Sequence, residues 1–225
     1  ARIPDIGTTA LGAVGLCFPV IVIITAFSNL FGTGGAPLFS IERGRKDTKE
    51  ASMIMNTSFF LICVCALLLM AVGMIFAKPI LLLFGSSENG LIYAYPYLMI
   101  YLLGTFPSMV ATGMNPFINA QGYATTGMIS VVIGAVANLI LDPIFIFAFG
   151  MGIRGAALAT GLGQVFTLLI YLFVYVFRPI SVKIGRRYLH TEDRLTGKLY
   201  AIGIPAILNM ALPSLLTTAL NAILS

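Results

Sequence analysis

Six long apolar runs, separated by short polar connectors, constrain the fold of this chain most strongly. A transmembrane helix needs about 20 consecutive, mainly apolar residues, and every run is at least that long. The runs cover residues 8–40, 52–77, 91–120, 128–149, 156–177 and 199–225. Strands of a membrane barrel are about 10 residues long and alternate strictly, which none of these runs does. We therefore predict an all-α integral membrane protein, a polytopic six-helix bundle.

Charge distribution agrees with a membrane location. Only 9% of the residues are charged, whereas soluble domains have about 25%. The net charge of +5 does not indicate nucleic-acid binding, because ten of the thirteen basic residues fall in the connectors 41–51 and 178–198. An even number of spans separates these connectors, so the positive-inside rule places both, with 121–127, in the cytoplasm. We predict a multi-pass protein of a bacterial or archaeal inner membrane.

Proline and glycine interrupt two of the runs. The first run carries Pro19 and a glycine-rich cluster at 32–37, which predicts a kinked or overhanging helix. Without a following Lys-Ser/Thr, these glycines do not form a phosphate loop, and we interpret them as sites of close helix packing. Pro96, Pro107 and Pro116 are expected to break the third run. Broken helices at membrane depth are tolerated where they line a cavity.

The fifth run presents two faces. Gly155, Ala159 and Gly163 recur every four residues and predict a small-residue packing face. Thr160 and Gln164 form a neighbouring polar face, in which we interpret Gln164 as structural. The G-x-G-x-x-G match at 150–155 joins two apolar runs and follows no strand, so it predicts a tight outer turn, not a nucleotide site.

Asp142 is the only acidic residue within a long apolar run. A charged Asp at membrane depth costs roughly 2.5 to 3.5 kcal/mol or more, and such residues are functional by default. Asn138 lies one helical turn away on the same face, and Pro143 cannot donate to the carbonyl of Leu139. Carboxylate, amide and spare carbonyl together suit a small hard cation or a proton. The alternative is that Asp142 lies at a water-exposed helix end.

Several sequence segments, in order along the chain, resemble the multidrug and toxic-compound extrusion (MATE) family. They are GGAPLFSIERGR at 34–45, NPFINAQG at 115–122, NLILDP at 138–143 and GIRGAA at 152–157. The resemblance implies about half of a twelve-helix, two-lobe transporter. Residues 1–177 are then an N-terminal lobe lacking its first helix, 178–198 a cytoplasmic connector and 199–225 the first helix of the second lobe. The remainder of the same polypeptide would supply the missing helices.

The same resemblance implies a function without enzymatic chemistry or a cofactor. Members of this family are secondary antiporters that export organic, often cationic, compounds in exchange for protons or sodium. Carried over by position, the family's first-lobe cation site corresponds to Asp142, Asn138, Asn115 and Thr160. The implied partners are small organic substrates and the lipid bilayer.

Three other functions are alternatives to antiport. An intramembrane enzyme would need two embedded Asp residues or a His-Glu-x-x-His motif, whereas this chain has one such Asp and a single His190. A flippase for lipid-linked saccharides, from a related transporter fold, would need a cationic cavity, yet no Lys or Arg lies deep in any run. The third alternative, a non-transporting assembly subunit, applies if the natural protein consists of these six helices.

Overall fold

The computed structural model describes residues 7–86, 88–177 and 195–209, and all its regular structure is helical. The elements are α1 (Gly7–Gly44), α2 (Thr48–Leu83), α3 (Glu88–Leu103), α4 (Thr105–Ala120), α5 (Ala124–Pro143), η1 (Ile144–Ala148) and α6 (Ile153–Phe177). Residues 195–209 are also helical. Counting α3 and α4 as one bent span, the described part has five segments long and apolar enough to cross a membrane. The all-α membrane prediction is confirmed, while most of the sixth run and His190 lie outside the described residues.

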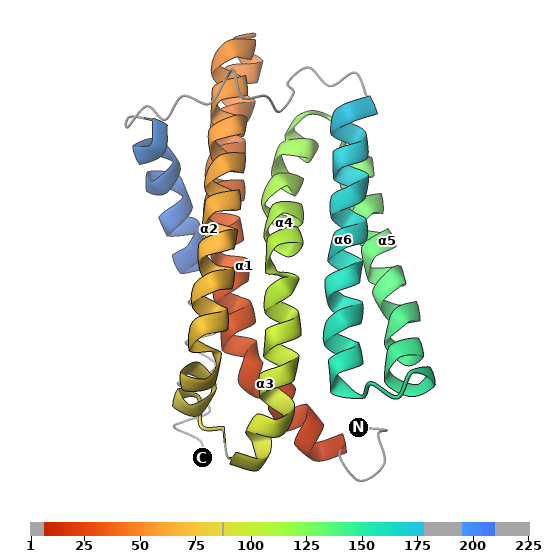
Figure 1. Cartoon of the computed structure of the whole chain (residues 1–225). Coiled ribbons are helices and arrows are strands. Elements are labelled where there is room, and N and C mark those ends of the chain that lie inside the picture. The colour runs from red at the N-terminus through yellow and green to blue at the C-terminus, as the bar shows by residue number, and fades with distance from the viewer. Residues whose placement is uncertain (1–6, 87, 178–194, 210–225) are drawn as a thin grey trace.

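Helix α4 occupies the middle of the bundle. It packs against α1 and α2 on one side and against α5 and α6 on the other (Figure 1). Helices α4 and α6 run in the same direction, and α5 runs antiparallel to both. The helical segment 195–209 lies beside α1, where Gly203 meets Gly34 and Leu30. This arrangement leaves α4, α5 and α6 as three neighbours whose facing sides can enclose a site.

The third run breaks at one place rather than three. Helices α3 and α4 meet at an angle of 52° around Gly104. Pro107 is the third residue of α4, where a missing N–H removes no intrahelical hydrogen bond. Pro96 and Pro116 lie inside α3 and α4, which continue through them. The expectation of three breaks is therefore wrong for these two prolines.

The first span overhangs the membrane, as predicted. Helix α1 is 38 residues long and continues through Pro19 and Pro37, and at 1.5 Å per residue it exceeds a hydrocarbon core of about 30 Å. Most of the predicted connector 41–51 is helical, because only a short turn separates α1 from α2. Asp47 caps α2 by accepting hydrogen bonds from the backbone N–H groups of Lys49 and Glu50.

Arg43 ties two turns together at this end of the bundle. Its guanidinium donates a hydrogen bond to the carbonyl of Ala120, the last residue of α4. A cation at a helix C-terminus is favourable because it meets the negative end of the helix dipole and an otherwise unpaired carbonyl. The α1–α2 turn and the α4–α5 turn therefore lie on the same side, which the charge pattern predicts to be cytoplasmic.

Glycines let the helix backbones touch, as the sequence predicts. A Cβ added to Gly32 would lie 2.6 Å from the carbonyl oxygen of Gly113, so α1 and α4 cross there without intervening side chains. Gly155 is similarly close to the backbone of Phe145. Small residues at crossings allow close van der Waals packing, which helps drive membrane helices together because lipid gives them no hydrophobic driving force.

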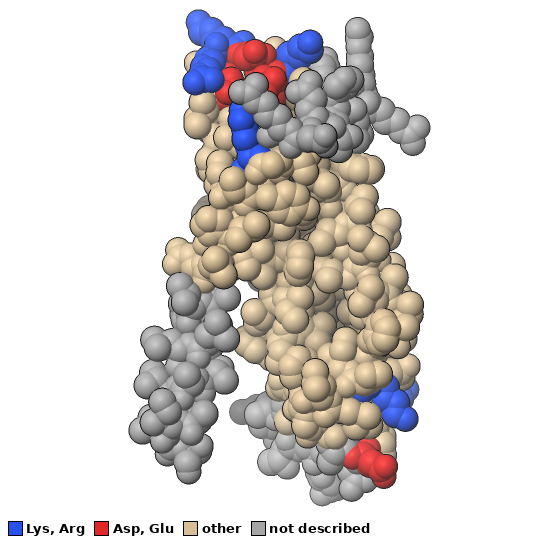
Figure 2. Space-filling view, turned by 90° about the vertical axis from the view of Figure 1, so that its left-hand side faces the viewer, with Lys and Arg blue, Asp and Glu red and all other residues tan. Residues whose placement is uncertain are grey.

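The surface is apolar between two charged ends. Figure 2 shows Lys, Arg, Asp and Glu gathered at the top and bottom, with uncharged residues between them. Large apolar side chains point outward along the spans, including Ile75 at 72% exposed and Leu139 at 72% exposed. Such a surface is stable in hydrocarbon and would aggregate in water.

The crossing of α1 and α4 provides a stability test. Gly32→Ala should lower the melting temperature in detergent, because its methyl group collides with backbone rather than a movable side chain, and overpacking costs about 1 to 3 kcal/mol. Gly15→Ala on the same helix is the matched control, since nothing lies within 4 Å of its added Cβ. Equal melting temperatures for the two variants would contradict the crossing.

Candidate functional site

A cavity of about 460 Å³ lies between α4, α5 and α6. Helix α4 contributes Thr112 and Asn115, α5 contributes Asn138, and α6 contributes polar side chains along its length. Its remaining lining is glycine, alanine and valine, and no lining residue carries a charge. The cavity therefore offers neutral oxygen and nitrogen atoms inside an apolar bundle.

Close contact between α5 and α6 sets which side chains meet in this cavity. A Cβ on Gly134 would lie 2.8 Å from the carbonyl oxygen of Gly163, and the reverse distance is also 2.8 Å. One turn from this contact, the Thr167 hydroxyl donates to the Ser130 carbonyl at 3.3 Å. The two glycines thus fix the register of the antiparallel pair.

The same alignment of α5 and α6 brings two of the predicted site residues into contact. The amide Nδ2 of Asn138 donates to the hydroxyl of Thr160 at 3.3 Å. That hydroxyl in turn donates to the carbonyl of Ala156 at 3.0 Å. The contact leaves the Asn138 amide oxygen available as a ligand for a cation.

Asn115, a third predicted site residue, lines the same cavity at its other end. Its amide oxygen lies against Gly127, 2.7 Å from where a Cβ would be. Gly127 and Asn138 are eleven residues apart on α5, which corresponds to about 16 Å along a helix. The structure therefore places Asn115 in the cavity but not beside the Asn138–Thr160 pair.

Asp142, the fourth predicted residue, lies one turn beyond Asn138 and outside the cavity lining. Its Oδ1 is buried and has no hydrogen-bond partner among the described residues. One face of α5 thus carries Asn138, which lines the cavity, and Asp142, which lies one turn further along the helix.

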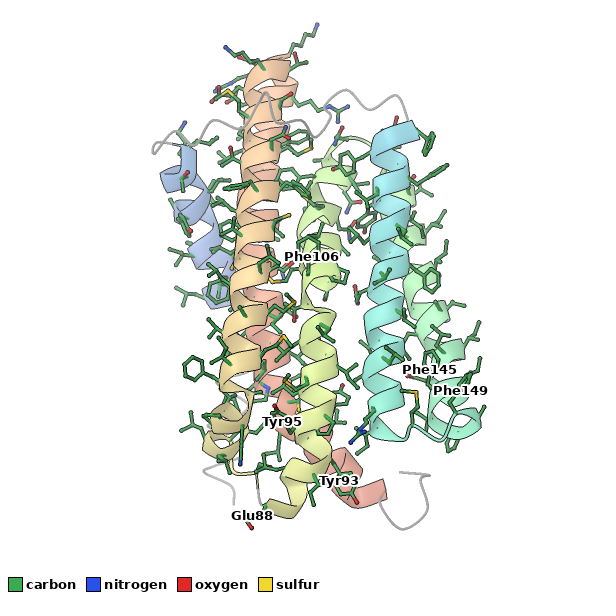
Figure 3. All side chains as sticks on the ribbon, in the orientation of Figure 1. Glu88, Tyr93, Tyr95, Phe106, Phe145 and Phe149 are labelled. Carbon is green, nitrogen blue, oxygen red and sulfur yellow. The ribbon has the colours of Figure 1, made fainter. Side chains whose placement is uncertain are left out.

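Helix α5 changes its winding directly after Asp142. Pro143 is its last residue, and residues Ile144–Ala148 form a π-helix. Phe145 and Phe149 pair at 5.8 Å between ring centroids, beside the start of α6 (Figure 3). Short π-helical segments of this kind are frequent at functional sites. The sequence marked the position through Pro143 but did not predict the π-helix.

Sequence reasoning missed part of the cavity lining. Thr160, Gln164, Thr167 and Tyr171 recur at spacings of four, three and four on α6 and all line the cavity. Gln164, interpreted above as structural, is one of them. The hydroxyl of Tyr171 is buried without a hydrogen-bond partner in the described structure. Continuing the helical spacing from Thr160 to Tyr171 would have found this polar stripe.

The chain is similar to known membrane transporters. Residues 3–144 match the family model described as MatE. The multidrug export protein MepA of Staphylococcus haemolyticus (strain JCSC1435) is 26% identical over 96% of this chain and 48% of that protein. The chain thus spans about half the length of the curated relatives it matches.

Solved structures agree with the sequence match. A structure of MATE in complex with MaD3S has a TM-score of 0.91 and 27% identity, covering 97% of this chain and 50% of that one. An inward-facing MATE family transporter of the MOP superfamily has a TM-score of 0.85 and 27% identity, covering 89% of this chain and 46% of that one. The all-helical arrangement is therefore one that known transporters share.

Cysteine labelling tests whether water reaches the cavity. In a background without Cys17, Cys63 and Cys65, Gln164→Cys should react with a water-soluble thiol reagent, because only the hydrated thiolate is nucleophilic. Val132→Cys is the control, since Val132 points outward from α5 at 52% exposed and does not line the cavity. We expect at least a tenfold difference in labelling rate. Equally slow labelling would show a dry site.

Proposed function

We propose that this chain, which belongs to the MatE family of membrane transporters, forms one lobe of a secondary active antiporter. The antiporter would export organic, often cationic, compounds in exchange for protons or sodium by alternating access. The observation that carries this proposal is the unpartnered, buried Oδ1 of Asp142, one turn from the Asn138–Thr160 pair. The Asn138–Thr160 pair is neutral, so Asp142 supplies the negative charge that a cation needs.

Competition for this charge would couple the two fluxes. An ionised carboxylate is costly inside a membrane, so Asp142 is stabilised by a proton, a sodium ion or a cationic substrate. When one of these binds, the others lose their electrostatic partner. A ligand shifts the equilibrium between the inward-open and outward-open states only by the difference in its affinity for the two states. Neutralising Asp142 in one state and not in the other provides that difference without any covalent step.

The proposal includes a second lobe. We propose that residues 1–177 form the first lobe, 178–198 the cytoplasmic connector and 199–225 the first helix of the second lobe. The chain's coverage of about half of its relatives supports this division. The close contact of Gly203 with the Leu30 carbonyl oxygen shows how the later segment packs on α1.

The competing functions gain no support. The relatives are named as multidrug export proteins and not as enzymes. A flippase for a lipid-linked pyrophosphate would need cationic side chains in its cavity, and the α4–α5–α6 cavity has none in its lining. The first-lobe site proposed at Asp142, Asn138 and Thr160 therefore suits a cation rather than an anion.

The main test replaces the carboxylate in the two-lobe protein. Reconstituted in liposomes, Asp142→Asn should abolish proton or sodium flux driven by an organic cation such as ethidium, because the exchangeable charge is gone. Glu88→Gln removes the same charge at the outer end of α3 (Figure 3) and should leave flux unchanged. Full coupled flux in folded Asp142→Asn protein would rule out the site.

A second test weakens the site without removing charge. Thr160→Val deletes the hydroxyl that Asn138 contacts, and loss of one hydrogen bond of about 1 kcal/mol should raise the half-saturating concentration of the coupling cation about fivefold. Thr125→Val, at an exposed position in the first turn of α5, serves as the control. Identical cation dependence in both variants would remove Thr160 from the site.

A further inference from the structure

We propose that Asn115 and Tyr171 form a second, weaker binding station for a monovalent cation, in the cytoplasmic half of the cavity. This inference rests on the proposed antiport function and extends it. The cation held near Asp142 would pass through this station on its way to or from the cytoplasm. The station is distinct from the Asn138–Thr160 pair because about 16 Å of α5 separates the two.

Two independent registers place Asn115 and Tyr171 at the same depth. In the antiparallel pair of α5 and α6, Ser130 lies opposite Thr167. Tyr171 is four residues further along α6 and is therefore level with the first turn of α5, around Gly127. Asn115 contacts Gly127. In the parallel pair of α4 and α6, Gly104, which directly precedes α4, lies against Gly161. Asn115 is eleven residues after Gly104 and is therefore level with residue 172 of α6. Both comparisons bring the two side chains to one level.

Each of the two side chains offers an unused oxygen atom. The Oδ1 of Asn115 and the hydroxyl of Tyr171 are buried and lack hydrogen-bond partners in the described structure. Tyr171 is only 2% exposed and lines the cavity. A buried hydroxyl or amide without a partner costs about 1 to 3 kcal/mol, so a ligand that supplies one is favoured. Thr112, one turn from Asn115, adds a third oxygen to the same lining.

The chemistry of the station suits a passing cation. Amide, hydroxyl and phenol oxygens coordinate sodium or potassium ions through their dipoles, as neutral oxygens do in channel filters. Without a carboxylate the station binds more weakly than Asp142 does. Passage requires binding that is favourable enough to enter and weak enough to leave. A neutral station between a charged site and water meets both conditions.

Tyr175 provides a matched control on the same helix. It lies one turn beyond Tyr171, is buried, and donates its hydroxyl to the sulfur of Met55 at 3.7 Å. It does not line the cavity. Tyr175→Phe therefore removes the same atom as Tyr171→Phe from a structural position outside the proposed path.

Anomalous diffraction from crystals of the two-lobe protein soaked in thallium(I) tests the station directly. We expect one peak near Asp142 and Asn138 and a second, weaker peak between Asn115 and Tyr171. The second peak should vanish in Tyr171→Phe and persist in Tyr175→Phe. A peak near Asp142 alone would overturn the station while leaving the antiport proposal intact. A second peak that survives Tyr171→Phe would also overturn the assignment.

Transport kinetics give an independent readout. Tyr171→Phe should slow sodium-driven ethidium transport about fivefold and leave the half-saturating external sodium concentration unchanged, because Asp142 is intact. Tyr175→Phe should transport at the unmodified rate once matched for folded protein. Equal rates in the two variants would overturn the station. If Asp142→Asn still abolishes coupling in that case, the antiport proposal stands and only the station is overturned.

Discussion

The structure of the site depends on one backbone contact, between Gly134 of α5 and Gly163 of α6. Each glycine lies so close to the other's carbonyl that a side chain on either would collide with backbone. This contact fixes the register of the pair and so brings Asn138 to Thr160. It also turns the polar stripe of α6 toward α4. Close packing and the polar cavity therefore have the same cause.

The membrane explains why charge is so sparse in this bundle. Every buried polar group must find a partner within the protein or in a cavity, because lipid offers none. The spans meet this demand with neutral side chains that mostly bond to their own helix, as Thr160 does. Asp142 departs from the pattern, and its position beside the π-turn at Ile144–Ala148 sets it apart from the regular helix. A single charge in such surroundings dominates the local electrostatics, so it can serve as the exchangeable element.

Sequence alone predicted the fold class because span length and apolarity are local properties. The glycine packing sites and the Asn138–Thr160 pair also followed, from helical spacing and from family resemblance respectively. The sequence could not show that Pro96 and Pro116 would stay inside helices, since neighbouring helices determine whether a proline bends a span. Nor did it show that Asn115 lies far from Asn138, because that distance depends on how α4 and α5 are aligned. Tyr171 was missed because aromatic residues in spans most often face lipid or the interface.

Equilibrium binding tests whether the coupling ion, a proton or sodium, and an organic cation compete for one negative charge at Asp142. Purified two-lobe protein would be titrated with ethidium, followed by fluorescence anisotropy, at increasing sodium concentration and separately at decreasing pH. Competition at Asp142 predicts that the apparent dissociation constant for ethidium rises in proportion to the concentration of the coupling cation. This dependence should disappear in Asp142→Asn. An ethidium affinity that is independent of both sodium concentration and pH in the unmodified protein would contradict competition at Asp142.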